Sequence, residues 1–144
     1  MRGFEIAKGF KNITLPKRGT SYSAGYDFEI CEAFTLNPGE IGLAKTGVKA
    51  YMQNDEVLKL YPRSSLPTKF GLTIPNSVGI IDSDYYSNKT NDGAIFIQLM
   101  NFTNQTVTLE KGTRIAQGIF TKYLLSDDDN AEGFRNGGFG STGH

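Results

Sequence analysis

The residues of this chain that could do chemistry are carboxylates, arginines and hydroxyls. They gather in four stretches, which read AGYD from Ala24, PRSS from Pro62, GIIDSDYY from Gly79 and GTRIAQG from Gly112. Hard oxygen ligands suit magnesium, and guanidinium groups suit phosphate anions. The four stretches together indicate phosphate handling with magnesium. Each taken alone is more often structural, for example a turn aspartate or a surface arginine.

Histidine and cysteine chemistry is excluded by counting. The only histidine is the last residue, His144, so a Ser-His-Asp or Cys-His arrangement is not expected. The single Cys31 provides no disulfide framework, and with one histidine it cannot make a Cys/His zinc site. Cys31 is interpreted as a small buried apolar residue.

The segment GFGSTG near the end of the chain matches the G-x-G-x-x-G phosphate loop only formally. No strand leads into it, no helix follows it, and no acidic residue lies downstream, so a dinucleotide-binding fold is not indicated. On composition alone, such a tail is typical of a disordered linker.

Length and charge set further limits. The 144 residues are enough for one domain with its own core, and 15 basic residues balance 15 acidic ones. A neutral chain has no overall field that would attract nucleic acid or an anionic membrane. Neither a secretory signal nor a run of ~20 apolar residues is present. We therefore expect a cytoplasmic protein, or one of the host cytoplasm if the origin is viral or phage.

The elements that must position these groups are predicted to be mainly β-strands. Apolar residues alternate at Ile41 and Leu43, and the segment AIFIQLMNF from Ala94 predicts a buried central strand. A hairpin is predicted at Lys111–Gly112, and frequent turn residues favour an all-β barrel or sandwich. The only helix expected is a turn or two within SSLPTKFG, with Ser64 or Ser65 as its cap.

The pattern changes after Tyr123. Residues 1–123 are predicted to form a β-barrel domain, and residues 124–144 an arm that is first acidic and then rich in glycine. The arm has too little apolar surface to fold alone.

In their order along the chain, five segments resemble the motifs of the trimeric deoxyuridine triphosphatase (dUTPase) family. They are AGYDFEI from Ala24, PRSSLPTKFG from Pro62, NSVGIIDSDYYSN from Asn76, GTRIAQGIF from Gly112 and NGGFGSTG from Asn136. The resemblance implies a jelly-roll-like β-barrel of the β-clip type, a homotrimer with shared active sites, and hydrolysis of dUTP to dUMP and pyrophosphate. This reaction lowers dUTP and supplies dUMP for dTMP synthesis. It also implies Mg²⁺ as the cofactor.

The resemblance assigns a role to each motif residue. Asp82 is implied as the general base for the water that attacks the α-phosphorus in line, and Asp27 as the carboxylate that holds magnesium through its water shell. Phosphate contacts are implied for Arg63, Ser64, Ser65 and Gln117, with Ser64 near the leaving oxygen. Tyr85 is implied to lie beneath the deoxyribose and to leave no room for a 2′-hydroxyl. Contacts to the uracil edge are implied for Asn76 and the backbone from Gly79 to Ile81.

The resemblance also gives the glycine-rich tail a function. In the family this tail crosses to a neighbouring subunit's site and orders over bound nucleotide, so the arm is expected to be mobile without it. Phe139 is implied to stack on uracil, and Gly140, Ser141 and Thr142 to contribute contacts to the γ-phosphate.

Three positions depart from the family pattern. The usual arginine lies five residues before the stacking phenylalanine, where this chain has Phe134, and Arg135 lies one residue later. A glycine-rich arm could absorb that shift, which leaves Arg135 as a candidate γ-phosphate contact or a solvated arginine. Ser65 replaces a common glycine. Ser87-Asn88 replaces the glycine after the tyrosine pair, and NKTNDG is expected to form a longer hairpin.

Three other functions are open at this point. A related dCTP deaminase would need a glutamate near the uracil contacts, and GIIDSDYY has none. A regulatory protein partner, gripped by the nucleotide-bound arm, could coexist with catalysis. An inactive sugar-binding or structural barrel is disfavoured because Asp27 and Asp82 are both present.

Overall fold

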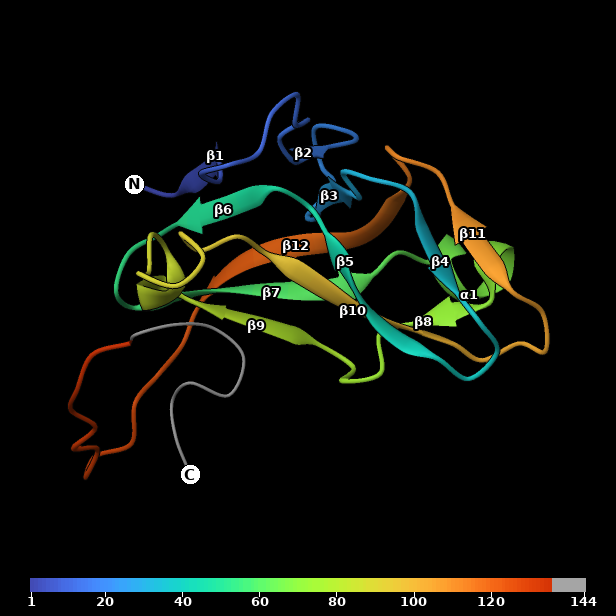
Figure 1. The fold of residues 1–144 in the computed structure, drawn as a ribbon. Helices are drawn as coiled ribbons and strands as arrows, with labels where there is room; N and C mark the ends of the chain where they lie inside the picture. Colours follow the sequence, from blue (N-terminus) through green and yellow to red (C-terminus); the bar gives the residue numbers. More distant parts are fainter. Residues whose placement is uncertain (136–144) are drawn as a thin grey trace.

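The computed structural model describes residues 1–135, and residues 136–144 lie outside the described part. The regular secondary structure of the described residues is almost entirely β (Figure 1). Its strands are β1 (Gly3–Ile6), β2 (Lys17–Arg18), β3 (Tyr26–Glu29), β4 (Phe34–Leu36), β5 (Ile41–Lys45), β6 (Val48–Tyr51), β7 (Glu56–Pro62), β8 (Leu72–Thr73), β9 (Gly79–Asp82), β10 (Phe96–Asn101), β11 (Val107–Leu109) and β12 (Arg114–Lys122). The helical elements are α1 (Ser65–Phe70) and the 3₁₀ turn η1 (Ser83–Tyr85).

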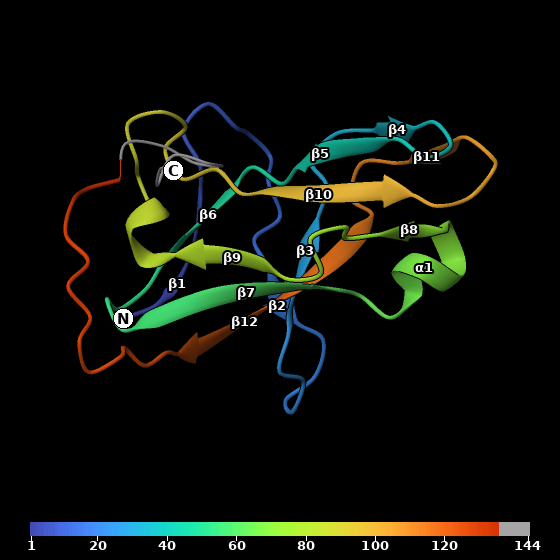
Figure 2. The same cartoon turned by 90° about the horizontal axis from the view of Figure 1, so that it is seen from below.

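The strands pair in antiparallel fashion within four sheets. The largest has the order β2-β3-β12-β7-β9, and a second has the order β5-β10-β8. Two-stranded sheets form from β1 with β6 and from β4 with β11. Figure 2 shows β5 beside β10 on one side of the molecule and the long strands β7 and β12 on the other. The predicted jelly-roll-like β-fold is confirmed, although no continuous ladder closes the described strands into a barrel.

One apolar core lies between these sheets. It includes Phe28 of β3, Leu58 of β7, Leu99 of β10 and Ile115 of β12, all of them fully buried. Because strand side chains alternate between two faces, the other face of the five-stranded sheet is free to carry polar groups. Asp27 and Gln117, which neighbour core residues in sequence, are accordingly only half-buried.

The predicted helix is confirmed, with one difference at its start. Helix α1 follows Ser64 and contains Pro67 in its first turn, and Gly71 ends it in the left-handed conformation. No side-chain hydrogen bond caps the helix, because Ser64 already has helical backbone angles. The Ser64 hydroxyl is therefore not used for capping.

Two predicted hairpins are wrong. A turn exists at Lys111–Gly112, where the Thr113 N–H donates to the Glu110 carbonyl. However, β11 pairs with β4 while β12 pairs with β3 and β7, so the turn joins two different sheets. Likewise, the segment NKTNDG lies between β9 and β10, which pair with β7 and β5 rather than with each other.

Strand β10 is central, as predicted, but it is not buried on both faces. Ile97, Leu99 and Asn101 are buried, while the residues between them are half-buried. Its neighbour β5 exposes Ile41 and Leu43. No helix in residues 1–135 is long and apolar enough to cross a membrane.

Candidate functional site

A first polar cluster surrounds Asp27 in the middle of the five-stranded sheet. Asp27 of β3 lies opposite Gln117 of β12. Its carboxylate forms an ion pair with Arg63 Nε at 3.1 Å and a longer one with Arg114 Nη1 at 3.7 Å. The sheet thus brings together residues from three predicted motifs that are far apart in sequence.

Gln117 is held within this cluster. Its side-chain Nε2 donates to the Pro62 carbonyl at 3.3 Å, just before Arg63. Gly25 approaches the Gln117 side chain so closely that an added Cβ would overlap its Oε1. The glycine of AGYD is therefore required by the packing of the first cluster.

A cationic groove adjoins the first cluster. It has a volume of about 530 Å³, and Arg63, Ser65, Lys69 and Arg114 are among its lining residues. Ser64, one residue before α1, is exposed, and Ser65 is half-buried. Guanidinium groups beside hydroxyls form a suitable surface for a phosphate chain.

A second polar cluster lies where β9 ends and η1 begins. Asp82 is exposed, and its Oδ2 accepts a hydrogen bond from Arg135 Nη2 at 2.6 Å. Arg135 Nε donates to Asp84 Oδ1 at 2.7 Å, and the guanidinium lies 5.9 Å from the centre of the Tyr85 ring. The described part of the arm therefore returns to the Asp82 of its own chain.

The residues expected to contact uracil lie just before Asp82 in the chain. Asn76 is exposed in the turn between β8 and β9, and Ser77 there has a positive φ of 69°. Gly79 packs over Leu60, where an added Cβ would meet the Leu60 Cβ at 3.2 Å. Ile81 faces the core, which leaves its backbone as the group available to a ligand.

The two clusters are far apart within one chain. Asp27, Gln117 and Tyr61 are aligned across β3, β12 and β7, whereas Asp82 on β9 pairs with Val57, four residues further along β7. Three strand spacings of ~4.8 Å and four residues of ~3.3 Å place Asp27 and Asp82 on the order of 20 Å apart. The predicted site residues therefore form two groups that a single chain does not bring together.

Sequence reasoning missed a set of residues in the loop 86–93. Asn88 is buried, and its Nδ2 donates to the Tyr85 carbonyl and to Asn91 Oδ1, both at 2.8 Å. Asn91 Nδ2 donates to the Tyr85 hydroxyl at 2.9 Å. The run of asparagines in NKTNDG could have indicated side-chain to backbone bonding, but not the contact with Tyr85.

The same loop is anchored to the body of the protein through Asp92. Asp92 Oδ2 accepts from the Lys8 N–H at 2.8 Å and from Lys49 Nζ at 2.9 Å. Lys49 Nζ also donates to the Ser87 hydroxyl at 3.0 Å. The hydrogen bond from Lys8 and then that from Lys49 hold the pKa of Asp92 below its usual range.

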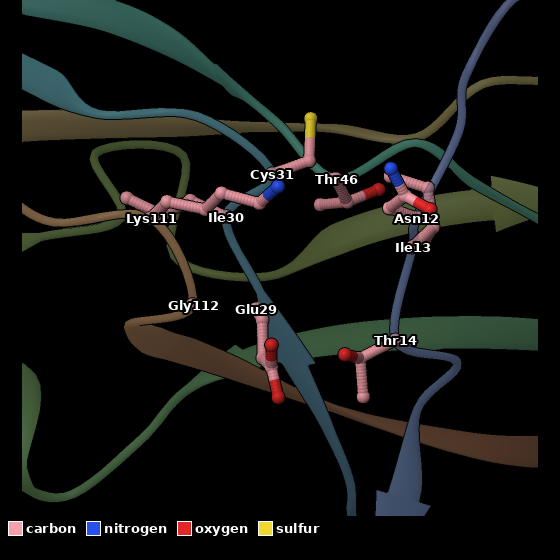
Figure 3. Close-up of a pocket in the computed structure, with 9 residues that line it drawn as sticks. All are labelled: Asn12, Ile13, Thr14, Glu29, Ile30, Cys31, Thr46, Lys111 and Gly112. Atoms are coloured by element: carbon pink, nitrogen blue, oxygen red, sulfur yellow. The ribbon is translucent and has the colours of Figure 1, made fainter.

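A small cavity of about 30 Å³ lies apart from both clusters (Figure 3). Glu29, Cys31, Thr46 and Lys111 are among its lining residues, and none of them belongs to the predicted site. Cys31 is half-buried rather than fully buried, and burial raises the pKa of its thiol. This cavity is too small for a nucleotide.

The arrangement of strands matches that of a class of nucleotide hydrolases with jelly-roll-like folds. The crystal structure of a dUTPase from Streptococcus mutans aligns with a TM-score of 0.81 and 51% identity, over 87% of this chain and 98% of that one. A dUTPase from Staphylococcus aureus phage phi11 aligns with a TM-score of 0.77 at 21% identity, over 93% of this chain and 97% of that one, which supports the fold alone.

Sequence comparison gives the family. The family model for dUTPase matches residues 11–143. The chain is 54% identical over 147 residues to the deoxyuridine 5′-triphosphate nucleotidohydrolase of Lactococcus lactis subsp. lactis (strain IL1403), covering 99% of this chain and 98% of that protein. A protein of the same name from Leptospira interrogans serovar Lai is 36% identical, covering 92% and 93%. The chain belongs to the dUTPase family.

Of the fifth motif and the arginine before it, the structure describes only Arg135. Arg135 lies beside Asp82 and Asp84, as given above. Phe139, Gly140, Ser141 and Thr142 lie outside the described residues.

The Asp92 contacts predict how the loop 86–93 responds to acid. Because its folded-state pKa is lowered, Asp92 stabilises the fold above its unfolded pKa of ~3.9, and this contribution is lost as pH falls through the folded pKa. In Asp92→Asn we expect a lower melting temperature at pH 7, and a difference from wild type that narrows on titration from pH 5 to pH 3.

Melting curves at each pH measure this difference. Glu56, whose pKa is also lowered, is common to both proteins and does not affect the comparison. Parallel curves for the two proteins down to pH 3 would show that Asp92 has no such role.

Proposed function

We propose that this protein hydrolyses dUTP to dUMP and pyrophosphate. Membership of the dUTPase family supports the reaction, as does 54% identity to a named deoxyuridine 5′-triphosphate nucleotidohydrolase over nearly the whole chain. The observation that carries the proposal is the complementarity of the two clusters. One offers cations and hydroxyls to a phosphate chain, and the other offers an exposed carboxylate beside an aromatic ring.

We propose that the active site forms between copies of the chain in a homotrimer. A nucleotide cannot contact Asp27 and Asp82 of one chain at once if they lie on the order of 20 Å apart. A second copy that places its β9 and η1 against the first cluster would complete the site. The exposed apolar side chains of Ile41, Leu43 and Ile80 are suited to contacts between copies.

Asp82 is the proposed general base. Its side chain is about half exposed (51%), so water can reach it. A water that gives its proton to the Asp82 carboxylate attacks the α-phosphorus in line, and pyrophosphate leaves with the bridging oxygen. Arg63, Ser65 and Gln117 hold the phosphate chain, with Ser64 near the leaving oxygen. Phosphoryl transfer relies mainly on such positioning and charge stabilisation.

The donor set around Asp27 fits magnesium bound in part by the substrate. Residues 1–135 contain no group of three or more His, Cys, Asp or Glu side chains that could hold a metal alone. Magnesium is usually held by one or two carboxylates together with water and substrate phosphates. We propose that Asp27 contributes that carboxylate through the water shell, and that the ion neutralises charge on the triphosphate.

The nucleoside contacts are proposed from the positions of the second cluster. Asn76 and the backbone from Gly79 to Ile81 contact the uracil edge, and Tyr85 lies beneath the deoxyribose. Arg135 would exchange its carboxylate partners for the γ-phosphate. Residues 124–144 serve as an arm attached to the domain of residues 1–123, and its glycine-rich part supplies contacts to the nucleotide from a neighbouring copy.

The proposed setting is the cytoplasm, with dUTP as the small-molecule partner and no role for nucleic acid. Binding of a regulatory protein partner remains a prediction from the family resemblance.

A nucleotide panel tests the reaction. We expect pyrophosphate release from dUTP with magnesium, and a large drop when EDTA removes the metal. Activity on dCTP should be far lower, since a site that hydrogen-bonds uracil can reject a mismatched base by up to ~10⁴-fold. Activity on UTP, which has the same base, should be lower because the Tyr85 ring leaves no room for its 2′-hydroxyl. Pyrophosphate and ammonia are measured together. Ammonia release from dCTP, or no release of pyrophosphate from dUTP, would contradict the proposal.

The role of Asp82 is tested by Asp82→Asn. Loss of a positioned general base should lower kcat by about 10²–10⁴-fold while dUTP still binds, because the amide keeps the shape but cannot accept the proton. Calorimetric binding of a non-hydrolysable dUTP analogue gives the affinity, and single-turnover kinetics give the rate.

Asp84→Asn is the matched control, because Asp84 is also exposed and also pairs with Arg135. We expect it to retain turnover within severalfold of wild type. Equal losses in the two variants would show that charge near Arg135, rather than a base at Asp82, governs the rate.

A further inference from the structure

The loop 86–93 holds Tyr85 at both ends of the residue. At the backbone end, Asn88 Nδ2 donates to the Tyr85 carbonyl at 2.8 Å. At the ring end, Asn91 Nδ2 donates to the Tyr85 hydroxyl at 2.9 Å, and that hydroxyl donates to the Ala94 carbonyl at 2.7 Å. Both the hydroxyl and the carbonyl of Tyr85 are therefore fixed by residues that follow it within one loop.

The two asparagines also fix each other. Asn91 Oδ1 accepts from Asn88 Nδ2 at 2.8 Å and from the Gly93 N–H at 3.1 Å. Asn88 Oδ1 accepts from the N–H groups of Thr90 and Asn91. Tyr85 and Asn88 are only 6% and 8% exposed, and the bonds from Asn88 to the Tyr85 carbonyl and from the Tyr85 hydroxyl to Ala94 are buried. Bonds in such a network reinforce one another.

The loop cannot shift easily as a unit. Gly93, with φ of 85°, packs on the backbone of Tyr85 to Ser87, where an added Cβ would lie 2.8 Å from the Tyr85 carbonyl oxygen. On the other side, Asp92 bonds to Lys8 and Lys49 of neighbouring segments. The network is thus tied both to Tyr85 and to the body of the fold.

We propose that Asn91, supported by Asn88, is a positioning residue that sets the tilt of the Tyr85 ring and thereby the discrimination against ribonucleotides. The inference rests on the proposed function, in which Tyr85 lies beneath the sugar. A ring beneath deoxyribose excludes a 2′-hydroxyl only if it cannot rotate or retreat. Asn91 and the Ala94 carbonyl prevent that movement by holding the far end of the ring.

The chemistry of the contact between Asn91 and Tyr85 identifies a substitution that tests it. Burial raises the pKa of the Tyr85 hydroxyl, which keeps it a neutral donor to Ala94. The Asn91 amide then has to be the donor in the second bond. Asn91→Asp preserves the Oδ1 acceptor and the side-chain volume but removes the donating amide, so it disturbs the ring end of the network most directly.

The test compares kcat/KM for dUTP and for UTP in wild type and Asn91→Asp. We expect the dUTP/UTP ratio to fall about tenfold, within the range of effects that small misplacements cause, mainly through a rise in kcat/KM for UTP, because a ring that can retreat admits the 2′-hydroxyl. Asn104→Asp, the same change at an exposed asparagine outside the loop, should leave the ratio unchanged.

Tyr85→Phe tests the same inference independently. It removes the hydroxyl while leaving the bonds between Asn88 and Asn91 in place, so it should lower the ratio comparably even if Asn91→Asp folds poorly. In the Tyr85→Phe background, Asn91→Asp should cause little further change. An unchanged ratio in Tyr85→Phe, or in a folded Asn91→Asp, would overturn the inference while leaving dUTP hydrolysis intact. A wild-type protein inactive on dUTP would instead refute the proposed function.

Discussion

The pairing register of β12 is the constraint on which the account of this protein depends. This strand lies between β3 and β7, and its register fixes Gln117 opposite both Asp27 and Tyr61. One end of the shared ladder therefore collects the arginines and the carboxylate of the first cluster. The same ladder, continued through β7 to β9, carries Asp82 to a distant part of the sheet. A one-residue slip would turn these side chains to the opposite face.

In the proposed function, this separation gives the single chain two incomplete halves of a site. The first half has cations and hydroxyls, and its carboxylate Asp27 is paired with Arg63 and Arg114. The second half has an exposed carboxylate and an aromatic ring, with Arg135 placed across both. Assembly of copies would bring the halves together, and the requirement for a partner would follow from sheet geometry rather than from any additional domain.

The sequence predicted the family and the fold class better than it predicted strand pairing. Residue types and motif order were enough to identify Asp27, Arg63 and Gln117, and the structure brings these three together. The turn at Lys111–Gly112 was correctly located, but a turn reverses the chain without determining which strand the next one pairs with. That choice depends on burying Leu109 and Ile115 against the rest of the core, which is a non-local effect. For the same reason the contact between Asn91 and Tyr85 could not be predicted.

The claim that two chains build one active site is tested most directly by complementation. Chains carrying Asp27→Asn and Asp82→Asn are each assayed alone and then co-refolded in equal amounts. If Asp27 and Asp82 come from different copies, about one site in four receives both wild-type carboxylates on random assembly, and the mixture should regain about a quarter of wild-type dUTP hydrolysis. If the mixture is no more active than the separate variants, the site lies within one chain and the account is wrong.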